Sequence, residues 1–222
     1  MRKLLVAAVL ALVSPLAASA QVGLGAKLGI SFPIGDADRG EQLKDITSIQ
    51  VPLELSLNFH VTPAVKLGGY GGYAFAKTGS IVQDSCDFYG EDCTQHSWRA
   101  GVKGEVALGS GAPGSFRPYV GANWGWEWNV TKMEQFGEWG KMNISGWELG
   151  IEGGADSIIS PQLTAGFFVN LAFGSYGKIK TTYSSGAGLP DDSFSIPSAD
   201  RETHAWLTLG VRGNFDLQPA GY

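Results

Sequence analysis

The sequence predicts an all-β fold, an eight-stranded antiparallel up-and-down barrel that crosses a membrane, and three observations carry this prediction. Apolar residues alternate with glycine and charged residues over eight stretches of the chain, and only a β-strand has a period of two. The connections between these stretches alternate between long and short. Beyond residue 20, no window holds 18 consecutive apolar residues, which excludes a helical membrane span.

The first twenty residues have the features of a signal peptide. Arg2 and Lys3 precede an apolar run, Leu4–Leu12, and the segment ends in the small residues Ala18–Ala20. Cleavage would leave residues 21–222 as a single barrel domain, and loss of the two positive charges would change the net charge from −5 to −7. A chain of such acidity is poorly suited to binding nucleic acid.

The eight expected strands are each about ten residues or longer, which is the length that a tilted strand needs to cross a bilayer. They are Val22–Ile34, Ile49–Val61, Val65–Ala76, His96–Gly109, Arg117–Val130, Ser145–Asp156, Leu163–Lys178 and His204–Leu217. Four long loops, 35–48, 77–95, 131–144 and 179–203, then share one rim, opposite three short turns and both termini. Long loops outside and short turns in the periplasm are typical of barrels in the outer membrane of Gram-negative bacteria.

A soluble barrel of the lipocalin type also alternates, but its apolar phase faces inward. Two observations weigh against that alternative. The apolar phase of one expected strand carries Trp124, Trp126 and Trp128, which would overfill a small interior. Most strand glycines share the phase of the charges, where a narrow lumen lets small and long side chains interleave, whereas on a water-facing surface they would only weaken the strands. The apolar phase is therefore expected to face lipid.

Aromatic residues should gather where the barrel wall meets the membrane interface. In the apolar phase, most of them lie toward the rim of the long loops. The expected belt consists of Phe32, Tyr73, Phe75, Trp98, Trp126, Trp128, Trp147 and Phe173.

The inward phase carries balanced charge, and this is the main candidate site. Its members are Lys27, Lys66, Arg99, Lys103 and Arg212 against Glu54, Glu105, Glu127, Glu148 and Glu152, with Asp156 near one end. An unpaired ion in so narrow a lumen costs several kcal/mol. A salt-bridge network that plugs the barrel is one interpretation, and a gated polar path whose pairs exchange partners is the other. An interior that eight strands only just fill with side chains favours the plug.

At the level of architecture, the mature chain resembles the small eight-stranded outer-membrane barrels, the OmpA-like transmembrane domain and its relatives. The final strand is similar to the signal read by the barrel-assembly machinery, with Thr208, Gly210 and Phe215 at matching positions. Gly213 stands where that signal usually has a hydrophobic residue. The resemblance implies assembly by that machinery, contact with outer-membrane lipid and lipopolysaccharide, and a monomer without the peptidoglycan-binding domain that some relatives carry.

Cys86 and Cys93 lie in the second long loop, seven residues apart around a glycine. Two cysteines in an exported chain favour a disulfide. Metal binding is the alternative, but two thiols without a nearby histidine fall short of a tetrahedral set. The bond should shape the loop rather than hold up the barrel.

The remaining chemistry is sparse, so we predict no catalytic residues, no metal and no cofactor. His96 and Ser97 are adjacent, so their side chains point to opposite faces of a strand and cannot share a proton. The long loops are acidic in sum, which suits a solvated surface or, alternatively, divalent cations shared with lipopolysaccharide phosphates.

The pattern favours a structural or adhesive membrane body that presents four loops to a partner outside the cell. A narrow conduit for small solutes or apolar molecules is the first alternative. A lipid-modifying enzyme is the second.

Overall fold

The computed structural model describes residues 21–38, 41–90, 92–109, 114–135, 138–183, 192–197 and 201–217. The predicted signal peptide lies outside these residues. Two short helices accompany the strands, which are β1 (Gln21–Asp38), β2 (Glu41–Gln42), α2 (Leu43–Ile46), β3 (Thr47–His60), β4 (Val65–Thr78), α3 (Ser80–Tyr89), β5 (Asp92–Ala107), β6 (Phe116–Gln135), β7 (Glu138–Ile158), β8 (Leu163–Tyr183), β9 (Asp192–Ser195) and β10 (Thr203–Asp216).

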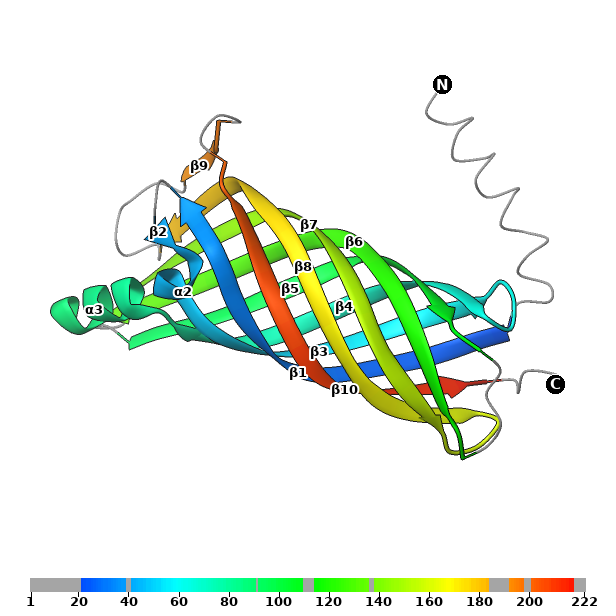
Figure 1. Ribbon diagram of the computed structural model, residues 1–222. Coiled ribbons are helices and arrows are strands. Elements are labelled where there is room, and N and C mark those ends of the chain that lie inside the picture. The colour runs from blue at the N-terminus through cyan, green and yellow to red at the C-terminus, as the bar shows by residue number, and fades with distance from the viewer. Residues whose placement is uncertain are drawn as a thin grey trace, which may run out of the picture.

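The long strands form a closed eight-stranded antiparallel barrel, as the sequence predicts (Figure 1). Each long strand pairs with its neighbours along the chain. β10 closes the sheet by pairing with both β8 and β1. Closure pairs both edges of every long strand, so the backbone hydrogen bonds are satisfied within the wall. Among the described residues, neither helix is long or apolar enough to cross a membrane.

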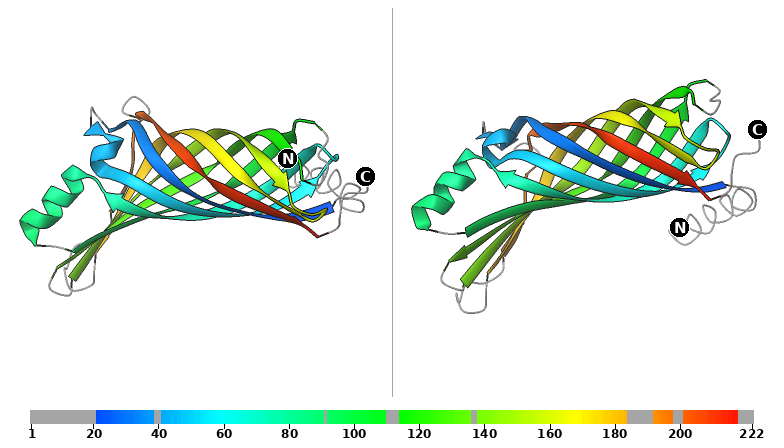
Figure 2. Two further views of the ribbon diagram at one scale, coloured as in Figure 1. Left: turned by 60° about the horizontal axis from the view of Figure 1, so that its bottom comes forward. Right: turned by 90° about the horizontal axis from the view of Figure 1, so that it is seen from below.

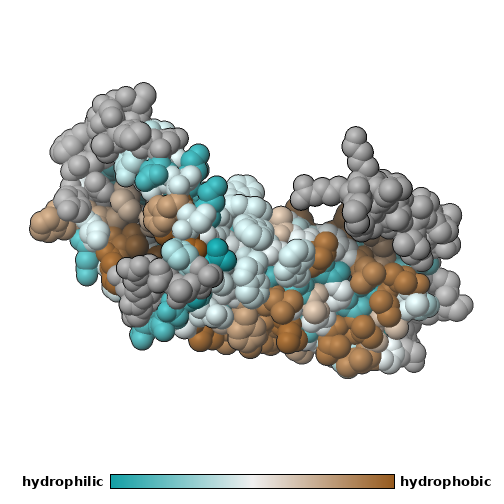
Figure 3. Space-filling model, turned by 90° about the horizontal axis from the view of Figure 1, so that it is seen from above, coloured by the Kyte–Doolittle hydropathy of each residue, from teal (hydrophilic) through white to brown (hydrophobic). Residues whose placement is uncertain are grey.

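The alternation predicted from the sequence separates the two faces of the wall. In β1, Leu24, Leu28 and Ile30 are exposed on the outside, whereas Lys27 and Ser31 are buried inside. Figure 3 shows hydrophobic side chains over much of the outer wall. An apolar outer face around a charged interior is the arrangement of a membrane barrel and the reverse of a lipocalin.

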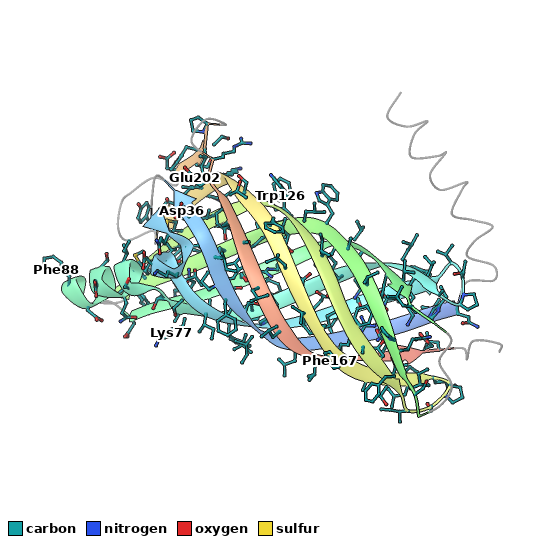
Figure 4. The ribbon with its side chains drawn as sticks, viewed as in Figure 1. Asp36, Lys77, Phe88, Trp126, Phe167 and Glu202 are labelled. Atoms are coloured by element: carbon teal, nitrogen blue, oxygen red, sulfur yellow. A yellow bond between two sulfur atoms is a disulfide. The ribbon has the colours of Figure 1, made fainter. Side chains whose placement is uncertain are left out.

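The aromatic residues of the expected belt lie on the outer face. Those that are largely exposed are Phe32, Phe75, Trp98, Trp126, Trp147 and Phe173, while Tyr73 and Trp128 are partly exposed. Figure 4 shows Trp126 and Phe167 pointing away from the wall. Tyr73 packs edge-on against Phe75 and Trp98, with ring centroids 4.9 and 4.7 Å away, so neighbouring strands share one aromatic cluster.

Both helices and the short strands β2 and β9 lie at one end of the barrel, which we call the loop end (Figures 1 and 2). The other end, the turn end, carries the short connections near residues 61–64 and 159–162. The described parts of the four predicted loops include helices and strands. In the third, β6 and β7 continue as a paired ribbon to Gln135 and Glu138, where the sequence analysis placed a loop over 131–144. Alternation there is too irregular to predict the ribbon.

The second long connection contains α3, which the sequence analysis did not predict. Val82 and Cys86, four residues apart, form its buried face. The helix ends at Gly90, whose positive φ of 66° suits a residue without a Cβ. Cys86 and Cys93 form the predicted disulfide, which joins α3 to the start of β5.

Glycines in the inward phase make room for large side chains inside the barrel. A Cβ on Gly125 would lie 2.5 Å from Tyr70 Oη and 2.6 Å from the carbonyl oxygen of Ala100. Gly101 faces the same tyrosine ring. Tyr70 can therefore cross the lumen only because two strands carry no side chain beneath it.

We expect Gly125→Ala to lower the free energy of unfolding by about 1 to 3 kcal/mol, because the new methyl group overpacks against Tyr70 and fixed backbone. The matched control is Gly71→Ala on the outer face, where the nearest atom to a new Cβ is 4.0 Å away. Denaturant unfolding of the barrel in lipid or detergent measures both. Equal stability of the two variants would contradict the packing argument.

Candidate functional site in the barrel lumen

The structure places all ten predicted lumen charges inside the barrel, and each has an oppositely charged group within 4.0 Å. None of their side chains is more than 25% exposed. The charges fall into two clusters along the barrel axis, one built around Arg212 and the other around Arg99. Lys66 lies apart from both, toward the turn end.

Arg212 on β10 is the centre of the cluster nearer the turn end. Its guanidinium makes a bidentate pair with Glu105 on β5, at 2.6 and 2.8 Å, and another with Asp156 on β7, also at 2.6 and 2.8 Å. The guanidinium carbon lies 3.4 Å from the ring centroid of Tyr119. The planar fork of arginine matches two carboxylates at once, which a lysine ammonium could not do.

Lys27 and Lys103 extend this cluster along the lumen. Lys27 pairs with Glu152 at 2.5 Å and with Glu54 at 3.2 Å, and Lys103 reaches the same Glu54 oxygen at 3.2 Å. Tyr119 donates its hydroxyl to Glu152 over 3.0 Å. Every carboxylate here therefore has a cation or a hydroxyl donor, as burial requires.

Arg99 on β5 is the centre of the cluster nearer the loop end. It pairs with Glu127 at 2.9 Å and lies 3.6 Å from Glu148. Tyr70 donates to Glu148 over 3.1 Å, and Trp206 donates to Glu127 over 3.3 Å. A cavity of about 40 Å³ between the two clusters is lined by Lys27, Glu54, Arg99 and Glu152, among others, and has space for only a few water molecules.

Sequence reasoning missed the aromatic members of both clusters and the group at the turn end. Tyr70, Tyr119, Tyr176 and Trp206 are all buried and share the phase of the charges. Their positions in the inward phase of their strands could have identified them from the sequence. At the turn end, a carboxylate oxygen of Asp216 lies 2.9 Å from His60 Nε2 and 4.0 Å from Lys66 Nζ.

The three residues of the predicted assembly signal lie on different faces of β10. Thr208 is buried and forms a 2.6 Å hydrogen bond with Ser31, while Phe215 is exposed on the outer wall. Gly210 lies under the ring of Phe168. Recognition by the assembly machinery stays a prediction. Within the described ranges, no group of three or more His, Cys, Asp or Glu side chains is arranged to hold a metal ion.

A closed barrel with an apolar wall, a charged interior and loops at one end defines a small outer-membrane β-barrel protein. The family model described as "Outer membrane protein beta-barrel domain" matches residues 4–206. The chain therefore belongs to this family, and its location is the bacterial outer membrane.

Solved structures are similar in fold at low sequence identity. A major outer membrane protein from Thermus thermophilus is 13% identical, with a TM-score of 0.55, and the match covers 89% of this chain and 100% of that one. OprG from Pseudomonas aeruginosa is 10% identical, with a TM-score of 0.46, and the match covers 88% of this chain and 96% of OprG. The outer membrane protease OmpT from Escherichia coli is 8% identical, with a TM-score of 0.40, and the match covers 89% of this chain and 96% of OmpT. At 13% identity, the similarity to the Thermus thermophilus protein shows the fold alone. No curated protein sequence matches the chain.

We expect Arg212→Met to lower the free energy of unfolding by about 3 to 5 kcal/mol, because it strands buried carboxylates without their cation. The control is Lys132→Met. Lys132 pairs with Glu134 at 2.6 Å in the half-exposed ribbon of β6, and such a pair is worth under about 1 kcal/mol. Denaturant titrations of both variants test this, and a loss for Arg212→Met no larger than the control would show that the lumen pairs contribute little.

Proposed function

We propose that the protein is a passive membrane body with a structural or adhesive role, which presents its loop end outside the cell. The ion-pair network around Arg212 and Arg99 carries the proposal, since side chains from six of the eight long strands meet across the lumen. A conduit would need these pairs to separate, and each separated charge would lose a partner that offsets its burial.

The loop end is suited to contact with a partner. α3 projects from the barrel, and Phe88 lies at its tip (Figure 4). Phe88 is 82% exposed, and Ile81 on the same helix is 43% exposed. The disulfide between Cys86 and Cys93 ties the helix to β5, which limits the conformational entropy lost when it binds.

Several elements of the proposal concern the path to the membrane and the partners there. We propose export through a cleaved signal peptide, insertion by the barrel-assembly machinery of a Gram-negative bacterium, and residence as a monomer among outer-membrane lipid and lipopolysaccharide. The acidic loops would face the lipopolysaccharide phosphates, with divalent cations between the two.

The proposal includes no catalysis. Within the described part of the chain, His60 contacts Asp216, His96 stacks on Tyr73 and His204 stacks on Tyr176. None of the three makes a hydrogen bond to a serine hydroxyl among the described residues.

In planar bilayers, the purified barrel should give no steady channel of porin size, because the paired charges fill the lumen. A porin purified in the same detergent is the positive control for insertion. Steady open steps of porin size from the pure protein would favour the gated path instead.

For the adhesive role, bacteria that display the wild-type barrel should attach to protein-coated or hydrophobic surfaces more than bacteria without it. Phe88→Ser should remove most of that gain by deleting the exposed aromatic anchor. Asp84→Ser on the same helix is the matched control, with surface levels measured by antibody. Attachment that does not depend on the barrel would leave only the structural role.

A further inference from the structure

At the loop end, the barrel interior changes from charged to apolar. A cavity of about 180 Å³ opens there, lined by Leu43, Ile46, Gln95, Asn129, Thr131, Met142, Ile144, Tyr176, Ile179 and Ile196. Leu43, Tyr176 and Ile196 are buried, whereas Ile144 and Ile179 keep partial exposure. The residues that the structure describes therefore place the cavity inside the wall and leave it partly open toward the loop end.

A bulge in β8 contributes to this change of polarity. Ser145 pairs with Lys178 but the next residue, Gly146, pairs with Tyr176, so Gly177 is left without a partner on β7. One extra residue reverses the alternation of the strand beyond it. Lys178 consequently lies outside, and Ile179 joins Tyr176 on the inner face.

The same bulge holds the cover of the cavity. Ile196 donates its backbone N–H to the carbonyl oxygen of Gly177 over 3.0 Å. The carbonyl oxygen of Ile196 accepts from Arg201 Nε, also at 3.0 Å. α2 inserts Leu43, which packs in one cluster with Tyr176, Ile196 and Trp206. Two connections thus place apolar side chains over the mouth of the barrel.

The floor of the cavity offers hydrogen-bond acceptors that no group in the described part of the chain uses. Asn129 donates its amide to Tyr176 Oη over 3.0 Å, and Tyr176 in turn donates to Glu127 over 3.3 Å. This chain of donors turns Asn129 Oδ1 away from Tyr176. Among the described residues, neither Asn129 Oδ1 nor Gln95 Oε1 has a hydrogen-bond partner, and the two buried residues are each 6% exposed.

An apolar cavity with unused hydrogen-bond acceptors at its floor fits a ligand that is apolar at one end and carries a hydrogen-bond donor at the other. An apolar body would fill the space between the isoleucines, and a hydroxyl or amine at one end would satisfy an acceptor whose burial otherwise costs free energy. For size, an apolar protein cavity of about 150 Å³ holds one benzene molecule.

We propose that this cavity binds a small molecule of one aromatic ring with a hydrogen-bond-donating head, such as a phenol or an aromatic amine. The apolar body lies against Ile144, Ile179 and Ile196, and the head donates to Gln95 Oε1. Tyr176 and Trp206 form the floor of the cavity, and both donate to Glu127 of the charge network beneath it. The cavity therefore does not continue through the lumen. The proposal goes beyond the passive role, and it is tested by binding rather than by conductance or attachment.

The experiment follows the isoleucine methyl groups of the full barrel by NMR in lipid nanodiscs while phenol is added. Ile144, Ile179 and Ile196 should shift and saturate with a Kd of about 0.1 to 1 mM, as expected for a ligand of so few atoms. The lipid-facing methyl of Ile151 should not shift. No saturable shift up to about 10 mM phenol would overturn the proposal, and so would contacts between lipid acyl chains and the three cavity methyls.

Two variants separate the parts of the site. Ile144→Phe fills the cavity and should weaken phenol binding at least about tenfold, while Ile151→Phe on the outer face of the same strand should not. Gln95→Met removes one acceptor at similar side-chain volume and should weaken phenol binding about five- to tenfold. Toluene is as large as phenol but has no hydrogen-bond donor, so its binding should change less than about twofold. Equal effects on phenol and toluene, or phenol binding that survives Ile144→Phe, would overturn the proposal. If Ile144→Phe fails to fold, the comparison of phenol with toluene in Gln95→Met decides.

Discussion

The pairing of β10 with both β8 and β1 is the constraint on which the rest of the structure depends. Once the sheet closes, each side chain of a strand points either outward to lipid or inward to the narrow lumen. Successive side chains alternate between the two, because a strand has a period of two. Apolar residues then cover the outside. The interior receives everything else, including the ten predicted charges and Asp156, which have little contact with bulk water.

Most of those charges are arranged in two connected clusters rather than as isolated pairs. Arg212 joins carboxylates from β5 and β7, strands that are not its neighbours in the sheet, and Lys27 on β1 reaches Glu152 on β7. Such pairs cross the lumen and tie opposite walls together. The aromatic rings of Tyr119 and Trp206 lie over the guanidinium groups of Arg212 and Arg99, so apolar and charged groups pack in one layer.

The sequence alone predicted which residues face inward, because parity along a strand is a local property. It could not predict which charges meet, since the partner of Arg212 depends on the accumulated stagger of the strands between β5 and β10. It also missed the bulge at Gly177, which adds one residue without an unusual composition. α3 was not predicted for a different reason. Its two buried side chains, Val82 and Cys86, are too few to give the repeat of apolar residues that indicates a helix, because the rest of the segment is polar. The cavity rests on the bulge and on two connections, so it lay beyond a strand-by-strand interpretation.

The bulge at Gly177 has a consequence for how such barrels diversify. Because one extra residue reverses the alternation only from that point onward, the membrane-facing wall on the other side of the bulge keeps its apolar character unchanged. A single codon gained or lost in β8 would therefore exchange Lys178 for Ile179 at the mouth of the lumen. Insertion of one residue can thus make the interior at the loop end more apolar while the lipid-facing wall on the other side of the bulge is unchanged.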